Sequence, residues 1–108
     1  MATLNGPDDR AVRGLTKLNN KLYVVYEKSD TINVYTDQQP FTQLASIKTH
    51  GLKDPTDISA CNINNCLYVS DFGSCVWRVN TYNKVDKWLQ VTGAWSLSVT
   101  FEGQVVML

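Results

Sequence analysis

Two stretches of this sequence are nearly the same, 45 positions apart: Asn19-Asn20-Lys21-Leu22-Tyr23-Val24-Val25 and Asn64-Asn65-Cys66-Leu67-Tyr68-Val69-Ser70. The shared register continues to position 36, and eight of the eighteen pairs from position 19 onward are identical. Internal repeats with a period of about 20 to 50 residues are typical of solenoids and propellers. The repeat therefore predicts an array of similar units along the chain.

Each copy of the repeat consists of strand-forming segments. Ile32 and Val34, like Trp77 and Val79, alternate with polar residues, the period-2 pattern of a half-buried strand. We expect four strands per unit, at 12–18, 22–26, 31–35 and 41–47 and then at 57–61, 67–70, 76–80 and 85–91. We expect no helix, because no ten residues show a convincing 3.6-residue period.

The connections between these strands carry turn-forming residues. Asn tolerates a positive φ, so Asn19-Asn20 and Asn64-Asn65 suit the first hairpin turn of each unit. Gly51 and Gly73 are expected to supply the same freedom in other connections. Pro55 lacks an amide donor, which favours a place at the beginning of a strand.

A third unit begins near Trp95, where 96–101 and 104–108 read as two strands joined at Glu102-Gly103. The predicted organisation is a polar lead-in at 1–11, one unit at 12–53, a second at 54–93 and the first half of a third at 94–108. Four-stranded units of this length are typical of β-propeller blades.

The second unit also resembles a known class of blade. Pro55-Thr56-Asp57-Ile58, Leu67-Tyr68-Val69-Ser70-Asp71 and Val76-Trp77-Arg78-Val79 look like a blade of the NHL and YWTD propellers. The resemblance covers 12–108, and the first unit departs from it with Tyr26 in the place of Asp71. It implies an all-β fold of antiparallel four-stranded blades. Propellers of this class bind proteins or RNA and occasionally catalyse, so the resemblance selects no activity.

The number of blades is small for a propeller. Propellers close with about four to eight blades, and this chain supplies two and a half. Open sheet faces and unpaired edges favour association. We therefore expect a fold that is incomplete in one chain and completed by homo-oligomerisation, as head-to-tail interfaces close into rings. The alternative is a fragment of a longer propeller.

Composition and charge exclude some partners. The chain has 108 residues, ten basic and ten acidic side chains and no net charge. A nucleic-acid ligand is not expected, since most such binders carry a basic excess. There is no apolar run of about 20 residues and no signal peptide near the N-terminus, so we expect a cytoplasmic protein without a membrane segment.

Cys61 and Cys66 flank the Asn62–Asn65 turn on opposite arms of a hairpin. Residues that face each other on paired strands can have the Cα separation that a disulfide needs. Packed free thiols are the competing interpretation, because unpaired cysteines are commonly buried. Cys75 has no obvious partner. These spacings and the single histidine do not form a usual zinc set, so no metal or cofactor is expected.

The sequence contains no recognisable catalytic constellation. His50 lies in the connection between the units, and no nucleophile motif accompanies it. Asp71 follows a strand, and its carboxylate is expected to cap amides of the next turn. Trp77 and Trp88 stand in the places of Ile32 and Leu44 of the first copy, which predicts that both tryptophans pack between units. We therefore expect no enzyme.

Propellers commonly bind partners through the loops between blades and between the second and third strands. The candidates here are Lys28, His50, Lys53, Phe72 and Trp95. Trp95 is expected either to pack or to line a ligand surface. The sequence favours a non-enzymatic protein-binding scaffold. A lectin-like glycan binder, or a fragment of an RNA-binding or enzymatic propeller, remain as alternatives.

Overall fold

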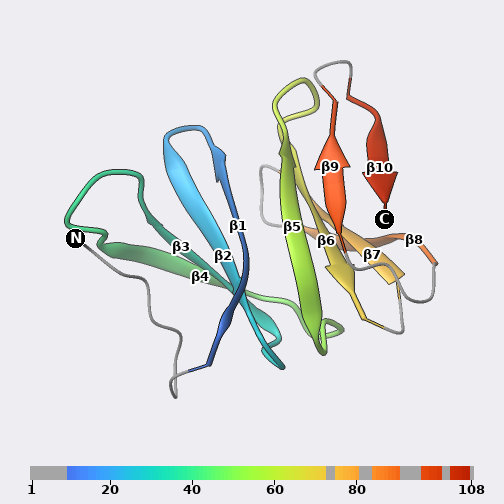
Figure 1. Cartoon of the computed structure of the whole chain (residues 1–108), viewed down its shortest axis with the longest axis horizontal. Coiled ribbons are helices and arrows are strands. Elements are labelled where there is room, and N and C mark those ends of the chain that lie inside the picture. Colours follow the sequence, from blue (N-terminus) through green and yellow to red (C-terminus); the bar gives the residue numbers. More distant parts are fainter. Residues whose placement is uncertain (1–9, 73–74, 81–83, 91–95, 101–102, 108) are drawn as a thin grey trace.

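The chain is built from antiparallel β-strands. The computed structural model describes residues 10–72, 75–80, 84–90, 96–100 and 103–107. In these ranges, two four-stranded sheets are followed by a two-stranded hairpin (Figure 1). No described residue is helical, so no helix in these ranges is long and apolar enough to cross a membrane. The all-β prediction is confirmed.

Each strand pairs with its neighbours in the sequence, in the orders β1-β2-β3-β4 and β5-β6-β7-β8. The first sheet consists of β1 (Val12–Leu18), β2 (Lys21–Tyr26), β3 (Thr31–Thr36) and β4 (Gln43–Lys48). The second consists of β5 (Pro55–Cys61), β6 (Cys66–Asp71), β7 (Cys75–Val79) and β8 (Val85–Leu89). The terminal hairpin pairs β9 (Leu97–Val99) with β10 (Val105–Met107). All ten predicted strands are present, and Pro55 begins β5 as expected.

The repeated asparagines form turns, as the sequence predicts. Asn19 and Asn20 have φ angles of 52° and 63° and connect β1 to β2 in a two-residue turn. In the second sheet the turn between Cys61 and Cys66 has four residues, and Asn65 has a φ of 53°. Asn19 Nδ2 donates to Asn65 Oδ1 at 2.7 Å, so the two turns are in direct contact.

Cross-strand pairing corrects part of the sequence alignment. Val24 pairs with Asn33 in the first sheet, and its counterpart Val69 pairs with Trp77 in the second. Trp77 is therefore equivalent to Asn33 and not to Ile32. A shift of one residue moves a side chain to the other face of a strand. The 45-residue spacing thus holds for β2 and β6, whereas β3 and β7 match at 44.

The fourth strands differ more from the expected alignment. Ile47 pairs with Ile32, and Leu89 pairs with the equivalent Val76, so the fourth strands match at about 42 positions and not at 44. Trp88 is 38% exposed and meets the ring of Tyr68 edge-on at 4.8 Å. The prediction that Trp88 packs between units is wrong. Trp77, by contrast, does pack against the core between the sheets.

That core lies between two sheet faces. Buried apolar side chains from both sheets form one cluster, whose members include Val25, Ile32, Val34, Ile47, Ile58, Leu67, Val69 and Val79. β1 and β5 run side by side where the sheets meet (Figure 1). Thr16 Oγ1 accepts a hydrogen bond from the Ala60 amide at 3.1 Å. A Cβ on Gly14 would lie 2.9 Å from the Ile58 nitrogen, so glycine permits this close approach of the two strands.

A second cluster packs the terminal hairpin against the other face of the second sheet. Its buried members are Cys61, Cys66, Tyr68, Val76 and Leu97, and Val99 and Val105 pack against them. The second sheet therefore contacts the first sheet with one face and the terminal hairpin with the opposite face.

The carboxylate of Asp71 joins the second sheet to the connection that precedes it. This fully buried side chain accepts hydrogen bonds from the Lys53 amide at 3.1 Å, the Asp54 amide at 2.8 Å and Trp77 Nε1 at 3.1 Å. The expected role as a cap is right in kind, and the amides that Asp71 caps among the described residues lie in the connection before β5. Buried carboxylates are tolerated when hydrogen bonds satisfy them in this way.

In the first sheet a different residue, Glu27, binds the chain that precedes the first strand. Tyr26 stands at the position of Asp71, and its hydroxyl bonds that of Tyr35 at 2.8 Å. The next residue, Glu27, accepts the Ala11 amide at 3.3 Å and Arg13 Nη2 at 3.2 Å. These two hydrogen bonds, that of Ala11 foremost, lower the pKa of Glu27. Both sheets thus hold the chain before their first strand with a carboxylate near the end of their second strand.

Gly51 has a packing role and not the conformational one that the sequence suggests. The φ of Gly51 is not in the left-handed region. Among the described glycines, only Gly103 has a positive φ, of 88°. A Cβ at Gly51 would overlap the ring of Trp77. Gly73 lies outside the described residues.

We predict that Asp71→Ala destabilises the protein by about 3 kcal/mol, because it leaves three donors without their acceptor. Chemical denaturation monitored by tryptophan fluorescence measures the change. The matched control is Glu27→Ala, which removes a carboxylate from a solvent-exposed bond network and should cost clearly less. Equal losses for the two variants would contradict the role given to Asp71.

Candidate functional site

Three of the five candidate binding residues lie around Asp54. The Lys28 amide donates to Asp54 Oδ1 at 3.1 Å, and the Phe72 amide donates to the Asp54 carbonyl at 3.0 Å. Lys53 is the preceding residue. The side chains of Lys28, Lys53 and Phe72 are all exposed. The structure thus brings the β2–β3 turn, the connection before β5 and the end of β6 to one end of the sheets. We call this set the loop surface.

Of the other two candidates, His50 does not lie in this group. His50 is exposed and lines a shallow depression beside Trp77 and Val85. Lys87 Nζ lies 5.6 Å from the centre of the Trp77 ring, within cation–π range. Trp95 lies outside the described residues.

The cysteines are buried thiols, and none of the three forms a disulfide. Cys61 and Cys66 face each other in the β5–β6 register, as the disulfide hypothesis requires. Burial raises the pKa of the Cys66 thiol and, with the Cys66 contact, raises that of Tyr68 to about 12. A protonated, buried thiol is a poor nucleophile. The packed-thiol interpretation therefore describes this structure.

Three aspartates at the ends of the second sheet accept hydrogen bonds from backbone amides. Asp57 Oδ2 accepts the Leu97 amide at 2.7 Å and thereby fixes the beginning of β9. Asp54 and Asp71 hold the turn and connection described above. In the described ranges, no three His, Cys, Asp or Glu side chains are grouped as metal ligands. These carboxylates thus hold the connections that enter and leave the second sheet.

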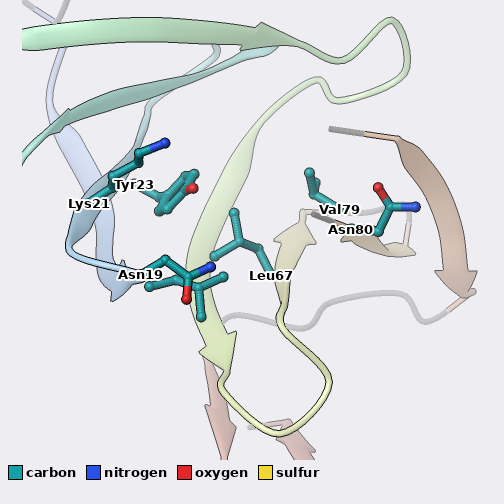
Figure 2. A pocket seen from close by; sticks show the side chains of 7 residues that line it. Asn19, Lys21, Tyr23, Leu67, Val79 and Asn80 are labelled. Atoms are coloured by element: carbon teal, nitrogen blue, oxygen red, sulfur yellow. The ribbon is translucent and has the colours of Figure 1, made fainter. Parts of the chain in front are cut away.

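A pocket that the sequence did not indicate lies between the two sheets (Figure 2). Its volume is about 160 Å³, and it is lined by Leu18, Asn19, Lys21, Tyr23, Leu67, Val79 and Asn80. Figure 2 shows Lys21 and Tyr23 on one side and Asn80 on the other, with Leu67 between them. We call it the junction pocket. It is on the side of the Asn-Asn turns, whose Asn19–Asn65 bond joins the two sheets next to it.

The polar groups of the junction pocket come from both sheets. Lys21 and Tyr23 are two residues apart on β2, so their side chains lie on the same face of the strand. Burial raises the pKa of the Tyr23 phenol, which is therefore protonated at neutral pH. Asn80 follows β7, and its side-chain carbonyl accepts the Lys84 amide at 3.0 Å. Sequence reasoning missed this set because its members meet only when β2 of one sheet faces β7 of the next.

Comparison with known proteins gives a likeness of fold. No protein-family model matches the chain, and no curated protein matches its sequence. Among solved structures, hydrazine synthase of Kuenenia stuttgartiensis is similar, with a TM-score of 0.72 and 17% sequence identity. The match covers 89% of this chain and 29% of that chain, so this chain spans less than a third of its length. At this identity the likeness concerns the fold alone.

We predict that the three thiols react with Ellman's reagent slowly in the folded protein and completely in denaturant without reductant. The reason is their burial and, for Cys66, the raised pKa. Three equivalents of thiol are expected per chain after unfolding. A single equivalent would show instead that Cys61 and Cys66 are bridged.

Proposed function

We propose that this chain is a non-enzymatic interaction module, in which β-propeller blades assemble head to tail with the blades of further copies. The observation that carries the proposal is a difference in exposure between equivalent positions. Two apolar residues that are buried at the contact between the two sheets, Ile58 and Ile47, have equivalents at the outer faces that are exposed.

The first such pair concerns the beginning of the stack. Ile58 lies on the face of the second sheet that the first sheet covers, and it is 3% exposed. Its equivalent is Leu15, because Leu15 pairs with Val24 as Ile58 pairs with Val69. Leu15 is 50% exposed. A further blade packed against the first sheet would bury it as Ile58 is buried.

The second pair concerns the other end. Ile47 lies on the face that the first sheet turns toward the second, and it is 6% exposed. Its equivalent Leu89, beside Val76, is 38% exposed. The terminal hairpin packs near Tyr68 and leaves Leu89 and Trp88 accessible.

The two exposed faces are different from each other, and each resembles one side of the contact that already exists. An interface between them is therefore heterologous, and repetition of such an interface gives a ring when the rotation closes. A second copy is the occupant that this continuity supports. The loop surface, with Lys28, Lys53 and Phe72, would then be repeated around the assembly and would be its surface for a protein partner, since aromatic side chains are frequent anchors of interfaces.

The cytoplasmic location belongs to the same proposal. Buried thiols at facing positions, as at Cys61 and Cys66, fit a reducing compartment, where disulfides rarely form.

We predict that light scattering after size exclusion gives a mass of two or more chains of 12.1 kDa at micromolar concentration. Leu15→Lys and Leu89→Lys should each reduce the mass to one chain, because each places a charge in an apolar interface. Ile63→Lys is the control, since Ile63 is 59% exposed in the β5–β6 turn and outside both faces.

A mixture of the two interface variants tests the head-to-tail arrangement. Leu15→Lys keeps the Leu89 face, and Leu89→Lys keeps the Leu15 face, so the mixture should form a one-to-one pair. A single-chain mass for the unmodified protein, or no pairing in the mixture, would contradict the proposal.

A further inference from the structure

The junction pocket has polar groups that donate hydrogen bonds and carry positive charge. The ammonium of Lys21 has three donors and no acceptor. Among the described residues, the salt bridges join Arg13 to Glu27 and Lys17 to Asp37, and Lys21 is in neither. Asp37 lines the open depression on the other side of Lys21, and its carboxylate lies 3.1 Å from Lys17. The seven residues that line the junction pocket include no carboxylate.

Tyr23 adds a second donor to the same wall. Its hydroxyl makes no hydrogen bond to any other described residue, although the ring is partly buried against the core between the sheets. A hydroxyl without a partner in the protein can donate its hydrogen bond to a ligand. On the opposite wall, the side-chain carbonyl of Asn80 accepts a hydrogen bond from the Lys84 amide.

Three apolar residues also line the pocket. Leu18, Leu67 and Val79 are buried members of the core, and their side chains form part of the lining. The volume of about 160 Å³ is below the range of about 300 to 1,000 Å³ that is usual for drug-sized ligands. It suits a ligand of a few carbon atoms.

From these contacts we propose that the junction pocket binds a small organic carboxylate with a short apolar body. The carboxylate lies between the Lys21 ammonium and the Tyr23 hydroxyl, and the apolar body contacts Leu67 and Val79. Both sheets contribute to the contact, so the ligand stabilises their packing. This site is separate from the proposed assembly, since every lining residue belongs to one chain and neither Leu15 nor Leu89 is among them.

The experiment is isothermal titration of the protein with butyrate and with its neutral isostere, butyramide. Butyrate is expected to bind in the millimolar range and about tenfold more tightly than butyramide, since a hydrogen bond to a charged group contributes more than one between neutral groups. Added salt should weaken butyrate binding. Inorganic phosphate should bind more weakly than butyrate, because it has no group for the apolar wall.

Variants locate the site. Lys21→Gln removes the charge and should weaken butyrate binding about tenfold, while Tyr23→Phe removes one hydroxyl and should weaken it about threefold. Lys53→Gln is the matched control, because Lys53 is an exposed lysine of the loop surface. The Leu15→Lys chain should bind butyrate as the unmodified protein does, which separates this test from the test of assembly.

Several results would overturn the proposal. One is the absence of butyrate binding at tens of millimolar to protein whose circular dichroism shows the folded sheet. Others are equal affinities for butyrate and butyramide, tighter binding of phosphate than of butyrate, or equal losses in Lys21→Gln and Lys53→Gln. If Tyr23→Phe unfolds the chain, the comparison of Lys21→Gln with its control still decides the outcome.

Discussion

Apolar contact between the facing sides of successive sheets is the interaction on which the rest of this structure depends. Each sheet is four strands wide, and the apolar face that it turns toward the other sheet is buried because the other sheet covers it. A solitary sheet of this kind would expose its apolar faces to water, at a cost of roughly 25 cal/mol for each Å² of apolar surface. The order of the elements in space therefore follows the order in the sequence, since each sheet covers the next.

Polar bonds fix how these faces meet. Asp57 and Asp71 accept amides of the chain that enters or leaves the second sheet, and Thr16 binds the amide of Ala60 across the seam. Apolar packing has little directional preference, whereas these hydrogen bonds require defined positions of donor and acceptor. The two kinds of contact together set one arrangement of the sheets. The junction pocket lies where that arrangement leaves a space between β2 and β7.

The sequence predicted the strands well because the strand signals are local. Alternation and β-branched residues act within a few positions, and the Asn19-Asn20 turn needs only the tolerance of asparagine for positive φ. The face of each strand was harder to predict, because it depends on turn length. Val25 and Ile32 enclose six residues, while the equivalent Ser70 and Val76 enclose five. That single residue places Trp77 opposite to its expected face. The junction pocket was not predictable, since its walls come from segments far apart in the chain.

The difference in turn length also limits how this repeat can be copied. The two units look interchangeable when they are aligned at the period of 45. That alignment puts Ile32 and Trp77 at the same position, although their side chains lie on opposite faces of their sheets. A consensus unit built from that alignment would have to choose between isoleucine and tryptophan at one position, although the two side chains belong to opposite faces of the sheet. Gly51, which leaves room for the indole, would have to be transferred along with Trp77 and the shorter turn. The segment that has to be copied as one piece is therefore the contact between two sheets, which is formed by the end of one sheet and the beginning of the next.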